Sequence, residues 1–134
     1  MGTVVVGYVP KPEGEAALDR GIDEAKLRGA QVVVVNSHRG GQEFDGSTAV
    51  KAEKQMEAVR AKLDASGLTY DLRQMVRGLE PAEDLIGIAD EASAELIVIG
   101  LRRRSPVGKL ILGSNAQRIL LDAKCPVLAV KAAD

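Results

Sequence analysis

The sequence is poor in the residues that carry most metal, redox and nucleic-acid chemistry. Its 134 residues include one cysteine and one histidine, and its aromatic residues are two tyrosines and one phenylalanine. A single cysteine excludes an internal disulfide and a multi-cysteine zinc site, and one histidine argues against His-rich metal sites and His-based catalysis. So few aromatic rings provide no platform on which single-stranded nucleic acid could stack.

Long apolar runs and an excess of charge are also missing. No apolar stretch approaches the roughly 20 residues that cross a bilayer, and the residues after Met1 lack the pattern of a signal peptide. The chain has 18 basic and 19 acidic residues and is 46% hydrophobic, an ordinary balance for a globular protein. Because compact domains commonly contain about 100–150 residues, we expect residues 1–134 to form one cytoplasmic domain without a metal.

Hydrophobic periodicity predicts strands and helices in alternation. The valines from Val32 to Val35 make a segment that is apolar on both faces, as in the central strand of a parallel sheet. Predicted strands cover residues 4–9, 31–37, 69–76, 95–99 and 126–130, and predicted helices cover 14–29, 48–65, a segment from Pro81 and a segment after 113. Strands that alternate with helices indicate an α/β fold with a parallel sheet, right-handed crossovers and helices on both faces.

Each predicted helix has an apolar stripe that should face the sheet. The stripe residues, taken helix by helix, are Ala17, Leu18, Gly21, Ile22 and Ala25; Ala52, Met56, Val59 and Leu63; Ala82, Leu85, Ile86 and Ala89; and Ala116, Ile119, Leu120 and Ala123. Gly29 is expected to end the first helix, and Pro81 suits the first turn of the third.

Ligands of an open parallel sheet bind beyond the carboxyl ends of its strands. The most unusual segment in such a position follows the fourth strand, where residues 100–114 contain three consecutive arginines, one lysine and a Gly-Ser pair. A helix that begins at such a pair offers free N–H groups and the positive end of its dipole to an anion. The alternative is that Ser114 and Gln117 form a capping box without a ligand and that the arginines belong to a solvated loop.

Standard nucleotide motifs do not fit this segment. Gly100 and Gly108 are too far apart for a P-loop, and Leu110 stands where that motif needs Ser or Thr. No G-x-G-x-x-G follows the first strand, which argues against a dinucleotide fold of that type. The early strand ends also lack the clustered aspartates of a phosphoacceptor domain.

Motifs along most of the chain resemble the universal stress protein family. Residues 100–114 are similar to its nucleotide-binding pattern G-x2-G-x9-G-[S/T], with Gly100, Gly113 and Ser114 in place and Arg103 at the second glycine. Further matching segments are residues 4–7, 78–82, 95–100, 118–120 and 125–130. The resemblance implies a Rossmann-like fold with strand order 3-2-1-4-5 and a homodimer, for which the apolar strand at 126–130 is the expected interface.

The resemblance also implies ATP, with Mg²⁺, as the ligand. The expected nucleotide-binding positions are Val9, Pro10, Ser37, Gly100, Arg102, Arg103, Gly113, Ser114 and Asn115. Val9 stands where many ATP-binding members carry an acidic residue for the ribose, and Ser37 falls at a largely main-chain contact to adenine. At the second glycine of the motif, the backbone can come close to the phosphate. Because a guanidinium pairs bidentately with phosphate, the Arg103 side chain is expected to bind the phosphate by its charge instead.

Two functions follow from these features. The first is a nucleotide-binding protein of stress response or signalling, without robust catalysis beyond slow ATP hydrolysis. The second is a dimeric module that binds no nucleotide and docks an acidic partner through Arg102, Arg103 and Arg104. Residues 96–121 carry five positive and no negative side chains, against 13 positive and 19 negative ones in the rest of the chain. One such patch is poor support for duplex nucleic-acid binding, and no Ser-His-Asp or Cys-His set indicates an enzyme.

Overall fold

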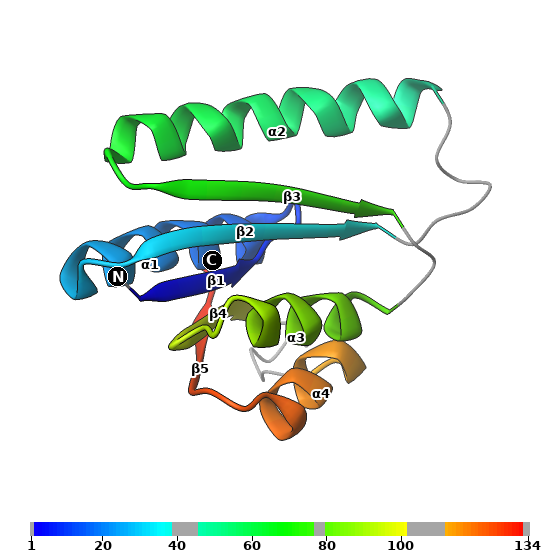
Figure 1. Cartoon of the computed structure of the whole chain (residues 1–134). Coiled ribbons are helices and arrows are strands. Elements are labelled where there is room, and N and C mark those ends of the chain that lie inside the picture. The colour runs from blue at the N-terminus through cyan, green and yellow to red at the C-terminus, as the bar shows by residue number, and fades with distance from the viewer. Residues whose placement is uncertain (1, 39–45, 77–79, 102–111, 133–134) are drawn as a thin grey trace.

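The computed structural model describes residues 2–38, 46–76, 80–101 and 112–132. Strands and helices alternate along these ranges, as Figure 1 shows, and this alternation confirms the predicted α/β class. The elements are β1 (Thr3–Gly7), α1 (Pro12–Arg28), β2 (Gln31–His38), α2 (Gly46–Ser66), β3 (Tyr70–Val76), α3 (Pro81–Glu91), β4 (Leu96–Leu101), α4 (Ser114–Asp122) and β5 (Val127–Lys131).

The strands form one parallel sheet in the order β3-β2-β1-β4-β5, which is the order that the family resemblance implies. In its centre, Val5 of β1 pairs with Val33 of β2 on one side and with Ile97 of β4 on the other. β5 forms one edge, and its four apolar residues are half-buried. The strand order reverses between β1 and β4, so this fold places a ligand crevice at their carboxyl ends.

Two hydrophobic cores cover the two faces of the sheet. Successive β1 side chains alternate between them, because Val4 and Val6 join the core beneath α1 and α2, whereas Val5 joins the core beneath α3 and α4. Figure 1 shows α2 along the top of the view and α3 beside α4 below. The run from Val32 to Val35 is buried throughout, which confirms its prediction as a central strand.

The predicted stripes of α1 and α2 are confirmed at every position that the structure describes, and that of α3 is confirmed except at Ile86, which is half-buried. The stripe of α4 is confirmed only in part. Ile119 is buried and Ala116 and Ala123 are half-buried, but Leu120, expected to point inward, is 39% exposed. These three inner residues define the centre of the stripe, and Leu120 falls at its rim because it lies 100° around the helix from Ile119. The side chain of Ala52 lies outside the described residues.

The junction between β1 and α1 has the predicted length of four residues but lies two residues earlier in the chain. β1 ends at Gly7 rather than at residue 9, although the N–H of Tyr8 still donates to the carbonyl of Val35 at 2.9 Å. α1 begins at Pro12, two residues earlier than predicted, since proline suits a first helical turn. At its other end Gly29 adopts φ 62°, which confirms the predicted helix end.

Candidate functional site

A cavity of about 190 Å³ opens at the carboxyl end of the sheet. We call it the carboxyl-end cavity. Residues from β1, the β1–α1 junction, β2, β4 and the first turns of α1, α3 and α4 surround it. The lining residues are Gly7, Tyr8, Val9, Glu13, Gly14, Val35, Pro81, Leu85, Ile99, Gly100, Asn115, Ala116 and Ile119. Ligands of open parallel sheets bind at this position, beyond the carboxyl ends of the strands.

The walls of this cavity are mostly apolar. Val35, Leu85, Ile99 and Ile119 belong to the core beneath α3 and α4 and continue into the cavity as its inner surface. Such walls can hold a flat apolar group such as a nucleobase. Side-chain polarity in the described lining is limited to Tyr8, Glu13 and Asn115, so a ligand meets few but well-defined polar contacts.

Besides α1, two further helices begin at the edge of the carboxyl-end cavity. Pro81 starts α3, while Asn115 and Ala116 belong to the first turn of α4, and all three residues line the cavity. The first N–H groups of a helix have no partner within the helix, and its dipole is positive at that end. At α3 these groups are already used, because Pro81 has no N–H, Ala82 donates to Asn115, and Glu83 and Asp84 donate to Glu80. The start of α4 therefore favours a negatively charged group on the ligand.

Asn115 joins these two helix starts. Its Oδ1 accepts a hydrogen bond of 3.2 Å from the backbone N–H of Ala82 in the first turn of α3. A backbone N–H can only donate, so the amide must present its oxygen to Ala82, and its Nδ2 is left as a donor. The side chain thus caps α3 from a neighbouring helix and offers N–H groups at the cavity.

Gly100 allows α1 to sit directly on the end of β4. A Cβ at Gly100 would overlap the carbonyl oxygen of Glu13, and a Cβ at Gly14 would overlap that of Val9. By contrast, a Cβ at Gly113 would meet nothing within 4 Å. The family motif predicts a nucleotide contact at Gly100, and the structure adds a packing role there: it lets backbone approach backbone and closes one side of the cavity.

The start of α4 differs from the predicted capping box. Gly113 is the N-cap and Ser114 is the first helical residue, so the Ser114 hydroxyl does not occupy the N-cap position. Gln117 donates its backbone N–H to Gly113 at 3.0 Å and its Nε2 to the carbonyl of Leu112 at 3.1 Å. Its side chain therefore stabilises the turn before the helix rather than closing a reciprocal box.

A buried tyrosine ties the β1–α1 junction to α2. The Tyr8 hydroxyl donates to Glu15 Oε1 at 2.6 Å, and Lys62 of α2 donates to Glu15 Oε2 at 3.3 Å and to Asp19 Oδ1 at 2.8 Å. Burial raises the pKa of the Tyr8 phenol above its usual value, and the hydrogen bond to Glu15 raises it further. The hydrogen bond to Asp19 is the main cause that raises the pKa of the Lys62 ammonium. These contacts hold α1 in place beside the cavity.

The predicted site residues fall into three groups in the structure. Val9, Gly100 and Asn115 come together in the cavity lining. Pro10, Gly113 and Ser114 lie next to lining residues in the chain or close to them, but are not among the described lining residues. Ser37 belongs to β2, and its side chain lies outside the described residues. Arg102 and Arg103 lie outside the described residues, as do Arg104 and Lys109.

Arg118 is the one cation of residues 96–121 that the structure describes. Its Nη1 lies 2.8 Å from Glu83 Oε1, and its Nε lies 3.6 Å from Asp122 Oδ2. These contacts link α4 to α3 on the protein surface. Arg118 is therefore paired with carboxylates and lies outside the cavity lining.

Sequence reasoning missed Glu13 and Leu85 as cavity residues. Both belong to the first two turns of helices that follow strand ends, the segments in which a parallel sheet positions its ligands. A search of the first two turns of every helix, in place of the most unusual loop alone, would have identified them. Among the described residues, no group of three His, Cys, Asp or Glu side chains could hold a metal ion.

The profile of the universal stress protein family matches residues 1–131. The chain belongs to this family. A universal stress protein of Mycolicibacterium smegmatis is 46% identical over 128 residues, which are 96% of each chain. Within the described ranges, no helix is both long enough and apolar enough to span a membrane.

Two solved universal stress protein structures from Archaeoglobus fulgidus share the fold of this family member. One superposes with a TM-score of 0.83 at 36% identity and covers 98% of this chain and 99% of its own. The other was solved in complex with dAMP and superposes with a TM-score of 0.76 at 30% identity, covering 98% of both chains. A protein similar to this chain in sequence and fold therefore binds an adenine nucleotide.

Proposed function

We propose that this universal stress protein binds an adenine nucleotide in the carboxyl-end cavity, with ATP as the expected ligand. The observation that carries the proposal is the joining of an apolar pocket to the start of α4. The pocket suits a base and the start of α4 suits a phosphate. The dAMP complex of a relative at 30% identity supports the same ligand class.

The proposed orientation follows from the charge distribution of the lining. The base lies between Val35, Leu85 and Ile99, and the phosphates lie toward Asn115 and the first N–H groups of α4. Glu13, the one charged side chain of the described lining, would repel a phosphate, so the phosphates point away from α1. In the sequence, three arginines follow β4 directly, and Mg²⁺ is expected to accompany ATP.

Binding without robust catalysis is the role that this lining supports. Its described residues include no histidine, cysteine or lysine, and the Tyr8 hydroxyl is engaged by Glu15. Nucleophilic catalysis requires a nucleophile activated by a neighbouring base, and the described lining offers one carboxylate, Glu13, with no such nucleophile. We therefore propose that nucleotide occupancy, rather than turnover, serves the stress response or signal.

We further propose that the protein is a homodimer through β5. This strand is at the edge of the sheet and pairs with β4 along its whole length, from Val127 to Lys131. Its residues from Val127 to Val130 are only half-buried. An apolar edge strand invites pairing with a second chain, and sedimentation of a monomer at micromolar concentration would contradict this proposal.

The direct test is calorimetric titration of Asn115→Asp with ATP and Mg²⁺, beside the wild type. Aspartate still accepts from Ala82 and adds favourable charge at two helix starts, so the thermal midpoint is maintained. The new carboxylate has no N–H donors and repels phosphate, so the affinity for ATP should fall at least about tenfold. Gln55→Glu on α2 is the matched control, because it adds the same charge outside the cavity.

Three results would decide this test. Wild-type binding that Asn115→Asp weakens and Gln55→Glu leaves unchanged supports the proposal. Equal affinity in all three proteins would contradict the assignment of the phosphates to α4. The absence of binding by the wild type at millimolar ATP and AMP would overturn nucleotide binding and favour the interaction module that docks an acidic partner.

A further inference from the structure

Glu13 and Glu15 lie two residues apart in α1 but have different surroundings. Glu15 is engaged by the hydroxyl of Tyr8 and the ammonium of Lys62. Glu13 is half-exposed and lines the carboxyl-end cavity, and among the described residues no ion pair or side-chain hydrogen bond engages it. A carboxylate in a cavity lining without a partner is a hydrogen-bond acceptor available to a ligand.

The backbone holds Glu13 firmly at this place. Its carbonyl oxygen lies against Gly100 of β4, and the next residue, Gly14, packs beneath the carbonyl of Val9. The N–H of Gly14 also donates to the carbonyl of Lys11 at 2.9 Å. The first turn of α1 is thus fixed between two backbone segments, and the Glu13 side chain extends from a fixed backbone position at the cavity.

The cavity therefore presents opposite hydrogen-bonding character on two sides. Ionised Glu13 can only accept, whereas Asn115 Nδ2 and the first N–H groups of α4 can only donate. A ligand that satisfies both sides has hydroxyl donors at one place and an anionic group at another. A ribonucleoside 5′-phosphate has this pattern, with its ribose hydroxyls separated from its phosphate.

We infer that Glu13 accepts a hydrogen bond from a ribose hydroxyl and makes the cavity selective for ribonucleotides over dideoxynucleotides; this inference rests on the proposed nucleotide binding. The sugar, rather than the base, meets Glu13 because this side chain is half-exposed beside the exposed Val9 and Pro10. The buried apolar walls at Val35 and Ile99 are left for the base. Glu13 is thus a specificity-determining contact that lies in α1 rather than at the end of β1.

The test compares AMP with 2′,3′-dideoxy-AMP on the wild type, Glu13→Ala and Glu13→Gln. A hydrogen bond to a charged group changes affinity by roughly tenfold to a hundredfold, so the wild type should prefer AMP by at least about tenfold. In Glu13→Ala the preference should fall to nearly one. Glu13→Gln retains an acceptor oxygen without the charge and should show an intermediate preference. Glu57→Gln on the exposed face of α2 removes the same charge and should keep the full preference.

A third ligand separates the sugar from the base. Purine riboside 5′-phosphate keeps both hydroxyls and lacks the exocyclic amine, so its affinity relative to AMP should be the same in the wild type and in Glu13→Ala. If Glu13→Ala changes that ratio instead of the AMP to dideoxy-AMP ratio, Glu13 contacts the base amine and the inference is overturned.

The remaining outcomes are equally decisive. A wild type that binds both nucleotides alike, or a preference that survives in Glu13→Ala, would overturn the role of Glu13 while nucleotide binding stands. A wild type that binds neither AMP nor ATP would overturn the proposed function itself. A helix-stabilising role of Glu13 alone would shift the thermal midpoint of the apoprotein and leave the AMP to dideoxy-AMP ratio unchanged.

Discussion

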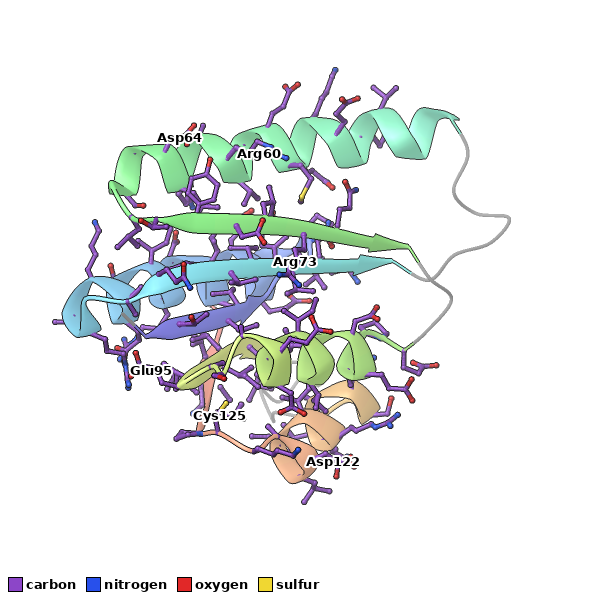
Figure 2. The ribbon with its side chains drawn as sticks, viewed as in Figure 1. Arg60, Asp64, Arg73, Glu95, Asp122 and Cys125 are labelled. Atoms are coloured by element: carbon purple, nitrogen blue, oxygen red, sulfur yellow. The ribbon has the colours of Figure 1, made fainter. Side chains whose placement is uncertain are left out.

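The sheet has a second cavity at its opposite end, and the two differ in what they can bind. This amino-end cavity, of about 120 Å³, lies before β4 and β5 and is lined by Ile86, Ala89, Asp90, Ser93, Ala94, Ile97, Ala123, Lys124 and Cys125. The same helices, α3 and α4, border both cavities, but they end at this one. Figure 2 shows Asp122 at the end of α4 and Cys125 in the turn before β5.

Helix direction accounts for the difference. The amino-end cavity meets carbonyl groups and the negative ends of two dipoles, and its charged side chains, Asp90 and Lys124, lie 3.6 Å apart as an ion pair. Burial is the main cause that raises the pKa of the Cys125 thiol, so it is protonated and weakly reactive at neutral pH. One pair of helices thus makes an anion-favouring cavity at one end and an anion-disfavouring cavity at the other.

Gly100→Val should have the largest effect on stability, because it disrupts the wall of the carboxyl-end cavity. The new side chain overlaps the backbone of Glu13, so α1 must move off β4, and we expect the free energy of unfolding to fall by about 3 kcal/mol. Gly113→Ala is the control within the same motif and should change it by no more than about 0.5 kcal/mol, because open space surrounds Gly113. Urea denaturation measures both. Equal losses would show that Gly100 has no special packing role.

Filling one cavity at a time separates their functions. Ala116 and Ala123 are half-buried alanines of α4, one lining each cavity. Ala116→Phe occupies the space of the proposed base and should weaken AMP binding at least about tenfold, which corresponds to about 1.4 kcal/mol. Ala123→Phe should leave the calorimetric affinity unchanged. If Ala123→Phe alone loses binding, the nucleotide binds in the amino-end cavity and the proposed site is wrong.

Tyr8→Phe should have a smaller effect that depends on pH. Below about pH 10, the variant loses the hydrogen bond to Glu15 and about 1 kcal/mol of stability. The raised pKa keeps Tyr8 protonated in the folded wild type, whereas unfolded tyrosine ionises above about pH 10. The unfolded wild type then binds fewer protons, so its stability falls as pH rises further. The gap between wild type and variant should therefore narrow above pH 10 in denaturation curves, and a constant gap would contradict this account.

The fold was predictable because its signals are local and repeated. The valines at 32–35 identify the central strand, and the periodic stripe of α1, including Ala17 and Leu18, identifies its buried face; both are confirmed. The prediction that Leu120 points inward was wrong, because a periodic stripe defines the buried side of a helix only to within the width of one face. The strand order required the family resemblance, since alternation of strands and helices is compatible with several orders.

The site was less predictable because its contacts join distant segments. Asn115 caps α3 across 33 positions of sequence, and Gly100 receives the backbone of Glu13. Neither contact has a local sequence pattern. The motif did draw attention to Gly100, and only the packing of α1 on β4 explains why a side chain is not accommodated there.

Isoleucine methyl NMR tests the central claim most directly, because the two cavities contain different isoleucines. Ile99 and Ile119 line the carboxyl-end cavity, and Ile86 and Ile97 line the amino-end cavity. On titration with ATP and Mg²⁺, we predict saturable shifts of the Ile99 and Ile119 methyl signals, with Ile86 and Ile97 unchanged. Saturable shifts of Ile86 and Ile97, or no shift of Ile99 and Ile119 at millimolar ATP, would contradict nucleotide binding at the carboxyl end of the sheet.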